Sequence, residues 1–372
     1  MLPVAAGFGG RTSWRRWAAL SRARAGCRAY VSGEAALYRA HGEPEKVISV
    51  EHVQMEQPGP HDLIIKFLAS PINPADINMI EGVYPVKPAT PAVGGNEGVA
   101  VVEHKGRAVK SFNRGDWVIP ARPGLGTWRT RAVVPEWDLA HVPNDIPLDA
   151  AAMLAVNPAS AYRMLQDFVT LLPGDYIIQN AANSTVGKCV IQLAKHMGVK
   201  TINVVRDRED LDSVKEDLDD LGADFVVTES LLAGKDYARE FAKVPKPVLA
   251  LNAVGGPSAT NIARALAPNG TLVTYGGMSK KPVTLPTGLL IFQNIVSRGF
   301  WLSRWTENTA PIDRDTMIMH LASLIREGRL KVGPSKRISF TDLPATLADR
   351  SRGKVLIEFD DDRFAATKAY IS

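Results

Sequence analysis

The stretch DYIIQNAANSTVGKCVIQLAKHMG, residues 175–198, decides the fold of this 372-residue chain. It begins with an apolar run of strand length, passes through a polar turn, and continues in a helical pattern. Five more apolar runs of strand length follow, at TINVVR, DFVVTE, PVLALNAV, GTLVTYG and IVSRGFWL, with helical patterns between several of them. Six such strands alternating with helices predict a parallel sheet covered on both faces, as in doubly wound nucleotide-binding folds.

The polar turn at residues 180–187 stands where such a fold holds the pyrophosphate of a dinucleotide. The helix that follows offers unpaired N–H groups and the positive end of its dipole. Of the glycines in a G-x-G-x-x-G loop only Gly187 is present, while Ala181 and Ser184 are small replacements. The hydroxyls of Ser184 and Thr185 suit phosphate, although a turn whose Ser or Thr only caps the helix remains the alternative.

The second strand ends in the triplet Arg206, Asp207 and Arg208. An acidic residue at this strand end usually accepts from the ribose hydroxyl of NADH, whereas arginine meets the 2′-phosphate of NADPH. The two arginines favour NADPH, and Asp207 favours NADH. A solvated charge cluster with no ligand is the third interpretation.

The chain before this unit has a different character. From residue 35 to residue 147 its short β-rich runs are separated by Gly and Pro, which predicts a β-barrel or sandwich-like unit. These runs are KVISVEHV, DLIIKFLAS, GVAVVEHKG, GDWVIPA and TRAVVP. A helix around residues 317–327 and strands at KRISF and GKVLIEF are expected to return to it. We therefore expect a β-rich domain at residues 34–153, a nucleotide-binding domain at 154–305, and a return to the first domain with a C-terminal tail at 306–372.

The first 33 residues contain six arginines and no acidic residue. With Trp14, Trp17 and Leu20 at helical spacing, this composition predicts a mitochondrial targeting peptide and a matrix location, with a basic tail for an acidic partner as the alternative. Removing the segment takes the formal net charge from +5 to −1, so no nucleic-acid partner is expected. No apolar run reaches the roughly 18 residues of a membrane span.

The stretch VGGNEGVAVV, residues 93–102, bears on whether a metal is used. Zinc-dependent medium-chain dehydrogenases also join a β-rich domain to a doubly wound one, and they carry Gly-His-Glu where this chain has Gly95-Asn96-Glu97. Their histidine ligates zinc, and their cysteine ligand has no counterpart in ASPINPADINMIEG. We therefore expect no zinc, and reduction of an activated C=C bond rather than alcohol chemistry. Glu97 is expected to accept hydrogen bonds as a structural group.

Six longer strings carry a closer resemblance: PINPADINMIEGVYPVKPATPAVGGNEGVA, GDWVIPARPGLGTWRT, VNPASAYRML, TINVVRDR, VTYGGMS and LLIFQNIVSRGFWLSRW. From residue 35 to about residue 305 the chain resembles the mitochondrial trans-2-enoyl-CoA/enoyl-acyl-carrier-protein reductase family. The resemblance implies a GroES-like β-rich catalytic domain with a six-stranded Rossmann domain, NADPH as cofactor, and a homodimer. It also implies reduction of enoyl-acyl carrier protein or enoyl-CoA, the last reductive step of mitochondrial fatty acid synthesis.

The resemblance also implies roles for individual residues. Tyr84, in EGVYPVKP, matches the proton donor of the family. Thr185 departs from the glycine that the family more often has, which is tolerated if the local φ is negative. The cofactor contacts of the family fall on Asn157, Asn183, Ser184, Thr185, Val186, Arg206, Asp207, Arg208, Tyr275, Gly276, Gly277, Met278, Phe300, Trp301, Leu302 and Lys354.

Two other functions remain open from the sequence. One is a quinone oxidoreductase of the same zinc-free branch, and the other is a non-catalytic NADPH-binding subunit of a mitochondrial complex. The apolar run at residues 289–292, with Phe300 and Trp301, fits either a tunnel for an acyl chain or packing in the core and at an interface.

Overall fold

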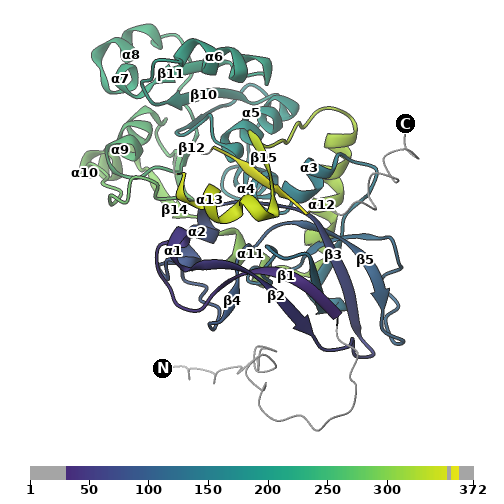
Figure 1. Ribbon diagram of the computed structural model, residues 1–372. Helices are drawn as coiled ribbons and strands as arrows, with labels where there is room; N and C mark the ends of the chain where they lie inside the picture. The colour runs from purple at the N-terminus through teal and green to yellow at the C-terminus, as the bar shows by residue number, and fades with distance from the viewer. Residues whose placement is uncertain (1–30, 350–352, 360–372) are drawn as a thin grey trace, which may run out of the picture.

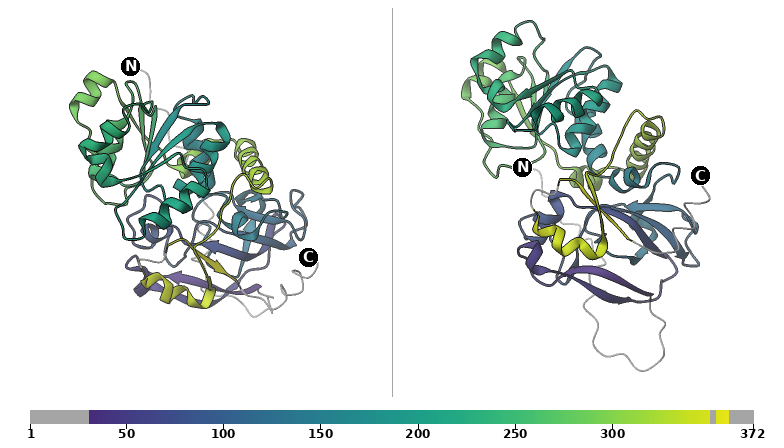
Figure 2. Two further views of the ribbon diagram at one scale, coloured as in Figure 1. Left: turned by 90° about the horizontal axis from the view of Figure 1, so that it is seen from above. Right: turned by 45° about the horizontal axis from the view of Figure 1, so that its top comes forward.

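The computed structural model describes residues 31–349 and 353–359, which form two lobes. In Figure 1 the teal and green lobe with the parallel sheet lies above the purple and blue β-rich lobe, and the yellow C-terminal segment returns to the lower one. The two views of Figure 2 show the same division.

The upper lobe is built on a six-stranded sheet in which every neighbouring pair is parallel. Its strand order, β11-β10-β9-β12-β13-β14, is that of a doubly wound nucleotide-binding fold, so the predicted fold class is confirmed. The strands are β9 (Tyr176–Gln179), β10 (Lys200–Val205), β11 (Phe225–Thr228), β12 (Leu249–Asn252), β13 (Thr271–Thr274) and β14 (Val296–Gly299).

Among the helices of this lobe, the one that follows β9 has capping residues at both ends. In α5 (Thr185–Met197), the Ser184 hydroxyl caps the first turn and Gly198, at φ 73°, ends the last one. One face of α5, including Cys189 and Val190, is buried against the sheet. The others are α4 (Asn157–Gln166), α6 (Leu211–Asp220), α7 (Glu229–Ala233), α8 (Lys235–Glu240), α9 (Gly256–Ala265) and α10 (Thr287–Gln293).

The β-rich lobe contains the five strands predicted before residue 147 and the two predicted near the C-terminus. Both C-terminal strands extend the sheet of β3, in the order β15-β16-β3-β5-β6-β8 with β7 also on β3. The strands are β1 (Val31–Tyr38), β2 (Ile48–Met55), β3 (Asp62–Pro71), β4 (Ala92–Val93), β5 (Val99–Lys105), β6 (Trp117–Pro120), β7 (Arg131–Pro135), β8 (Leu139–His141), β15 (Lys336–Ser339) and β16 (Val355–Glu358).

Strand β1 begins inside the segment of 33 residues that is expected to be a targeting peptide. Residues 31–33 belong to β1, where they pair with β2. The preceding residues, 1–30, lie outside the described part of the chain.

One hydrophobic cluster contains buried side chains from both lobes. Buried side chains of the β-rich lobe, such as Leu68 and Val99, pack in the same cluster as Ile177 of β9 and Leu321 of α12. The helices outside the upper lobe are α1 (Pro44–Val47), α2 (Pro74–Ile80), α3 (Leu148–Met153), α11 (Leu302–Asn308), α12 (Pro311–Arg326) and α13 (Leu343–Ala348). No helix in the described ranges is long and apolar enough to cross a membrane.

Candidate active site at the carboxyl edge of the parallel sheet

The predicted site residues gather along one edge of the parallel sheet. Residues 183–186 follow β9, residues 206–208 follow β10, residues 275–278 follow β13, and residues 300–302 follow β14. In parallel sheets the carboxyl ends of the strands form one ligand-binding edge. The four segments are therefore spread along an edge that suits an extended dinucleotide.

The turn between β9 and α5 has the geometry of a phosphate loop. The Gly187 N–H donates to the Ser184 hydroxyl at 3.2 Å, so Ser184 is the N-cap of α5. Thr185 begins the helix and is not among the residues with positive φ, which meets the condition set by its β-branched side chain. Ala181 is the residue that takes the left-handed conformation, at φ 50°.

Gly187 sets how closely α5 approaches the end of β9. A Cβ at this position would stand 2.4 Å from the carbonyl oxygen of Ala182, a residue that is fully buried. The Gln179 side-chain amide, at the end of β9, donates to the Gly187 carbonyl at 3.0 Å and so ties α5 to this strand. The close approach is the role of the third glycine in dinucleotide-binding loops.

Of the three charged residues after β10, Asp207 and Arg208 have hydrogen-bond partners in the protein, and Arg206 makes no ion pair with a described residue. Ser230, at the start of α7, donates to the Asp207 carboxylate from its N–H at 3.2 Å and also from its hydroxyl. The Ser230 hydroxyl holds the pKa of Asp207 below its usual value. Arg208 pairs with Asp210, with one N–H···O distance of 2.6 Å. Arg206 is exposed and makes no ion pair with any residue that the structure describes, so its charge is free for a phosphate.

The segment after β13 also fits a cofactor. The Tyr275 hydroxyl is buried beside Ser184 but makes no hydrogen bond of normal geometry, and burial raises its pKa. An unpartnered buried hydroxyl is costly unless a ligand completes it. A Cβ on Gly277 would meet nothing within 4 Å, so this part of the edge is open. The residues present therefore fit a dinucleotide.

Tyr84 reaches this edge from the β-rich lobe. The Trp301 indole N–H donates to the Tyr84 hydroxyl at 2.8 Å, and the two rings meet edge to face with centroids 6.0 Å apart. Burial raises the pKa of Tyr84, although hydrogen bonds from Trp301 and Ser303 oppose that shift. A raised pKa keeps the hydroxyl protonated at neutral pH, which suits a proton donor.

Asn157 and Lys354 meet on a residue that the sequence analysis did not select. The Asn73 side-chain oxygen accepts from Lys354 Nζ at 2.5 Å and from Asn157 Nδ2 at 3.4 Å. Asn73 precedes α2, and its N–H donates to Asp76 at 2.7 Å. The sequence NPAD, a capping residue followed three positions later by an acid, is the signal that would have drawn attention to this pair.

Asn96 and Glu97 occupy the place of the zinc-binding Gly-His-Glu motif. Asn96 donates to Asp76 at 2.6 Å and accepts from the Gly124 N–H at 2.8 Å. Glu97 is 1% exposed and accepts from Asn73 and from the Val156 N–H, as predicted for a structural group. Within the described ranges, no three His, Cys, Asp or Glu side chains are grouped so that they could hold a metal.

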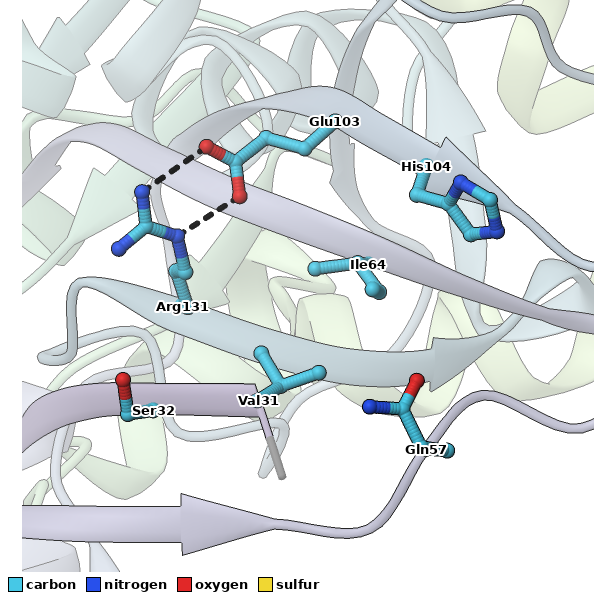
Figure 3. Close-up of a pocket in the computed structure, with 7 residues that line it drawn as sticks. All are labelled: Val31, Ser32, Gln57, Ile64, Glu103, His104 and Arg131. Carbon is cyan, nitrogen blue, oxygen red and sulfur yellow. Dashed lines mark hydrogen bonds and ion pairs between the residues drawn. The ribbon is translucent and has the colours of Figure 1, made fainter. Parts of the chain in front are cut away.

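A separate hollow of about 450 Å³ lies on the β-rich lobe, away from all the predicted site residues. In Figure 3, Glu103 and Arg131 lie side by side in its lining and are joined by hydrogen bonds of 2.7 and 3.0 Å. The other lining residues are Val31, Ser32, Gln57, Ile64 and His104. Its charged pair is mutually satisfied, and we assign it no part in a reaction.

Comparison with known proteins supports the assignment of class. Residues 59–144 match the Alcohol dehydrogenase GroES-like domain, and residues 185–315 match the family named Zinc-binding dehydrogenase. With the fold and the site, these matches define a medium-chain dehydrogenase/reductase.

Similar proteins indicate which family of medium-chain dehydrogenase/reductases the chain belongs to. The chain is 50% identical over 329 residues to the mitochondrial enoyl-[acyl-carrier-protein] reductase of Xenopus tropicalis, which covers 86% of this chain and 94% of that one. It superimposes on Etr1p in complex with NADP and crotonyl-CoA, and on the mitochondrial 2-enoyl thioester reductase Etr1p/Etr2p heterodimer from Candida tropicalis. Each superposition has a TM-score of 0.84 at 36% identity and covers 88% of this chain and 100% of the other. The chain belongs to the family of mitochondrial enoyl-[acyl-carrier-protein] reductases.

Proposed function

We propose that the protein reduces trans-2-enoyl thioesters to acyl thioesters with NADPH, as the last reductive step of mitochondrial fatty acid synthesis. The observation that carries the proposal is the contact between Tyr84 and Trp301 at the end of β14. It brings a protonated hydroxyl of one lobe to the carboxyl edge of the parallel sheet in the other. Relatives in this family are named enoyl reductases, and one was solved with NADP and crotonyl-CoA.

In the proposed reaction, a bound nicotinamide supplies the hydride that reduces the β-carbon of the enoyl thioester. Tyr84 donates a proton to the α-carbon, so the C=C bond becomes a C–C bond and the tyrosinate regains its proton from solvent. The Trp301 N–H donates to the Tyr84 oxygen and stabilises the negative charge that forms there. The Ser184 cap and the first turn of α5 would hold the pyrophosphate, and the free Arg206 would hold the 2′-phosphate.

Turnover of the purified protein tests this function. With a medium-chain trans-2-enoyl-CoA, we expect consumption of NADPH and formation of the saturated thioester, with NADH a much poorer reductant because Asp207 is engaged by Ser230. Turnover of quinones alone would instead support a quinone oxidoreductase. NADPH binding without turnover of any enoyl thioester would support a non-catalytic subunit.

We also propose a homodimer formed through β14 and α10. Strand β14 pairs only with β13 among the described residues, and its residues are exposed. Next to it, α10 exposes Leu290, Ile291 and Phe292, the last by 83%. An open strand edge beside exposed apolar side chains is typical of an interface, and a relative was solved as a heterodimer.

Replacement of Phe292 by aspartate is expected to convert the dimer to a monomer, because a charge would be buried in the interface. Analytical ultracentrifugation would measure the mass. Ile312→Asp is the matched control, since Ile312 is also exposed, by 69%, but lies on α12. A Phe292→Asp protein that stays dimeric, or a wild-type protein that is a monomer, would contradict this interface.

The matrix location is a proposal as well. It is supported by the arginine-rich composition of the first 33 residues and by relatives that are named mitochondrial. Fractionation of mitochondria into matrix and membranes would test it, and recovery outside the matrix would refute it.

A further inference from the structure

A buried carboxylate joins the two lobes beside the proposed site. Glu97 Oε1 accepts from the Val156 N–H at 2.7 Å, and Val156 is the N-cap of α4. Glu97 Oε2 accepts from Asn73 Nδ2 at 2.8 Å, and Asn73 is the N-cap of α2. One side chain therefore fixes the starts of two helices from different lobes.

Asn73 extends this link to two residues assigned to the cofactor. Its side-chain oxygen accepts from Lys354 and from Asn157, while its amide nitrogen donates to Glu97. Both polar atoms of its side chain are thus used, and the residue is only 5% exposed. The amide cannot rotate without breaking contacts on both sides.

Helix α2 carries the link to the proton donor. At its far end, the N–H groups of Val83 and Tyr84 both donate to the Asn78 carbonyl, at 3.0 and 3.2 Å. The start of α2 is held by Glu97 through Asn73, and its end holds the backbone of Tyr84. A shift at the start of so short a helix would move the Tyr84 hydroxyl against Trp301.

We propose that Glu97 is a positioning residue for the reduction, which sets Tyr84 relative to the dinucleotide-binding edge by tying α2 to α4. The inference rests on the proposed enoyl reductase function. Glu97 itself touches neither Tyr84 nor any reacting atom.

The ionised form of Glu97 favours the link. Both of its oxygens accept from N–H donors, and a proton on either oxygen would make that oxygen a poorer acceptor and weaken its contact. Burial raises the pKa of Glu97 to about 7, and the charge of Lys354 opposes this. The other ionisable groups that face the cluster are Asp76 of α2, whose pKa burial raises to about 6, and the Cys189 thiol of α5. The fraction of intact links should therefore rise with pH through about 7.

Exchange of the donor and acceptor between Glu97 and Asn73 tests the proposal. In Glu97→Gln an amide N–H would face a donor, and in Asn73→Asp two carboxylates would face each other. The double variant Glu97→Gln/Asn73→Asp restores every contact. Its new amide at position 97 would donate to the new carboxylate at position 73, and that carboxylate would still accept from Lys354 and Asn157. Since small misplacements of reacting groups are costly, we expect kcat for the enoyl thioester to fall about 10- to 100-fold in each single variant.

The double variant is expected to return to within about threefold of the wild-type kcat. Its acidic limb is expected to move below pH 7, because the carboxylate now stands at position 73, where Lys354 contacts it and favours the ionised form. Glu103→Gln, in strand β5 and in the Arg131 pair, is the control and should change neither kcat nor its pH profile. Unchanged kcat and pH profile in Glu97→Gln, or a double variant as slow as the slower single one, would overturn the proposal. Lack of enoyl thioester turnover by the wild type would instead refute the proposed function, so the two failures are distinguishable.

Discussion

Replacement of Tyr84 by phenylalanine is expected to slow enoyl thioester reduction by about 10²- to 10⁴-fold, the usual contribution of a general acid. The phenyl ring would keep its edge-to-face contact with Trp301, while the hydroxyl that accepts from the indole would be lost. Steady-state kinetics with NADPH and a medium-chain trans-2-enoyl-CoA would measure the change in kcat.

Two controls separate loss of the acid from loss of the fold. Titration with NADPH should give nearly the same Kd for Tyr84→Phe and the wild type, because the phosphate loop is untouched. Tyr237→Phe should behave as wild type, since Tyr237 stacks on Phe241 of the nucleotide-binding lobe and not at the proposed site. A Tyr84→Phe protein whose kcat stays within about threefold of the wild type would remove Tyr84 from the mechanism.

The second large effect is expected at Gly187. In Gly187→Ala the new Cβ would stand 2.4 Å from the Ala182 oxygen. Ala182 cannot easily move, because its N–H donates to the Val204 carbonyl in the buried sheet edge. Overpacking of this kind costs about 1 to 3 kcal/mol of folding free energy. It would also push the start of α5 away from the pyrophosphate.

We therefore expect a lower midpoint of urea unfolding and at least a roughly tenfold weaker Kd for NADPH in Gly187→Ala, as one lost charge-assisted contact would give. Gly333→Ala is the matched control, because Gly333 lies outside the proposed site and a Cβ there would meet nothing within 4 Å. Wild-type stability and wild-type NADPH affinity in Gly187→Ala would show that the helix and the strand do not need this close approach.

The strands of the parallel sheet were predictable from sequence because each lies in a mainly apolar run of strand length, with turns or helical patterns between the runs. Strands β4 and β8, of two and three residues, were missed since they are too short to show any alternation. Strand β1 was missed in part because its first three residues continue the acid-free composition of the leader. Composition cannot locate a strand boundary inside such a segment.

The parts of the site that lie at the ends of parallel strands were predictable from the strand order. The contacts that depend on how distant segments pack were not. Residues at the ends of β9, β10, β13 and β14 share an edge in any parallel sheet of this order. The contact between Tyr84 and Trp301 joins residues 217 positions apart, and only the family resemblance singled out both. The links from Asn157 to Asn73 and from Val156 to Glu97 depend on how the two lobes pack, which no local pattern encodes.

The left-handed backbone of Ala181 has a consequence for how the phosphate loop meets its ligand. A non-glycine residue in this conformation costs about 1 kcal/mol, which the folded protein bears whether or not a ligand is bound. The Cβ of Ala181 also excludes many of the backbone conformations that a glycine would allow at this point in the loop. The free loop then resembles the bound one, and less conformational entropy is lost on binding. A loop with fewer glycines than the G-x-G-x-x-G pattern is in this respect the more preorganised receptor.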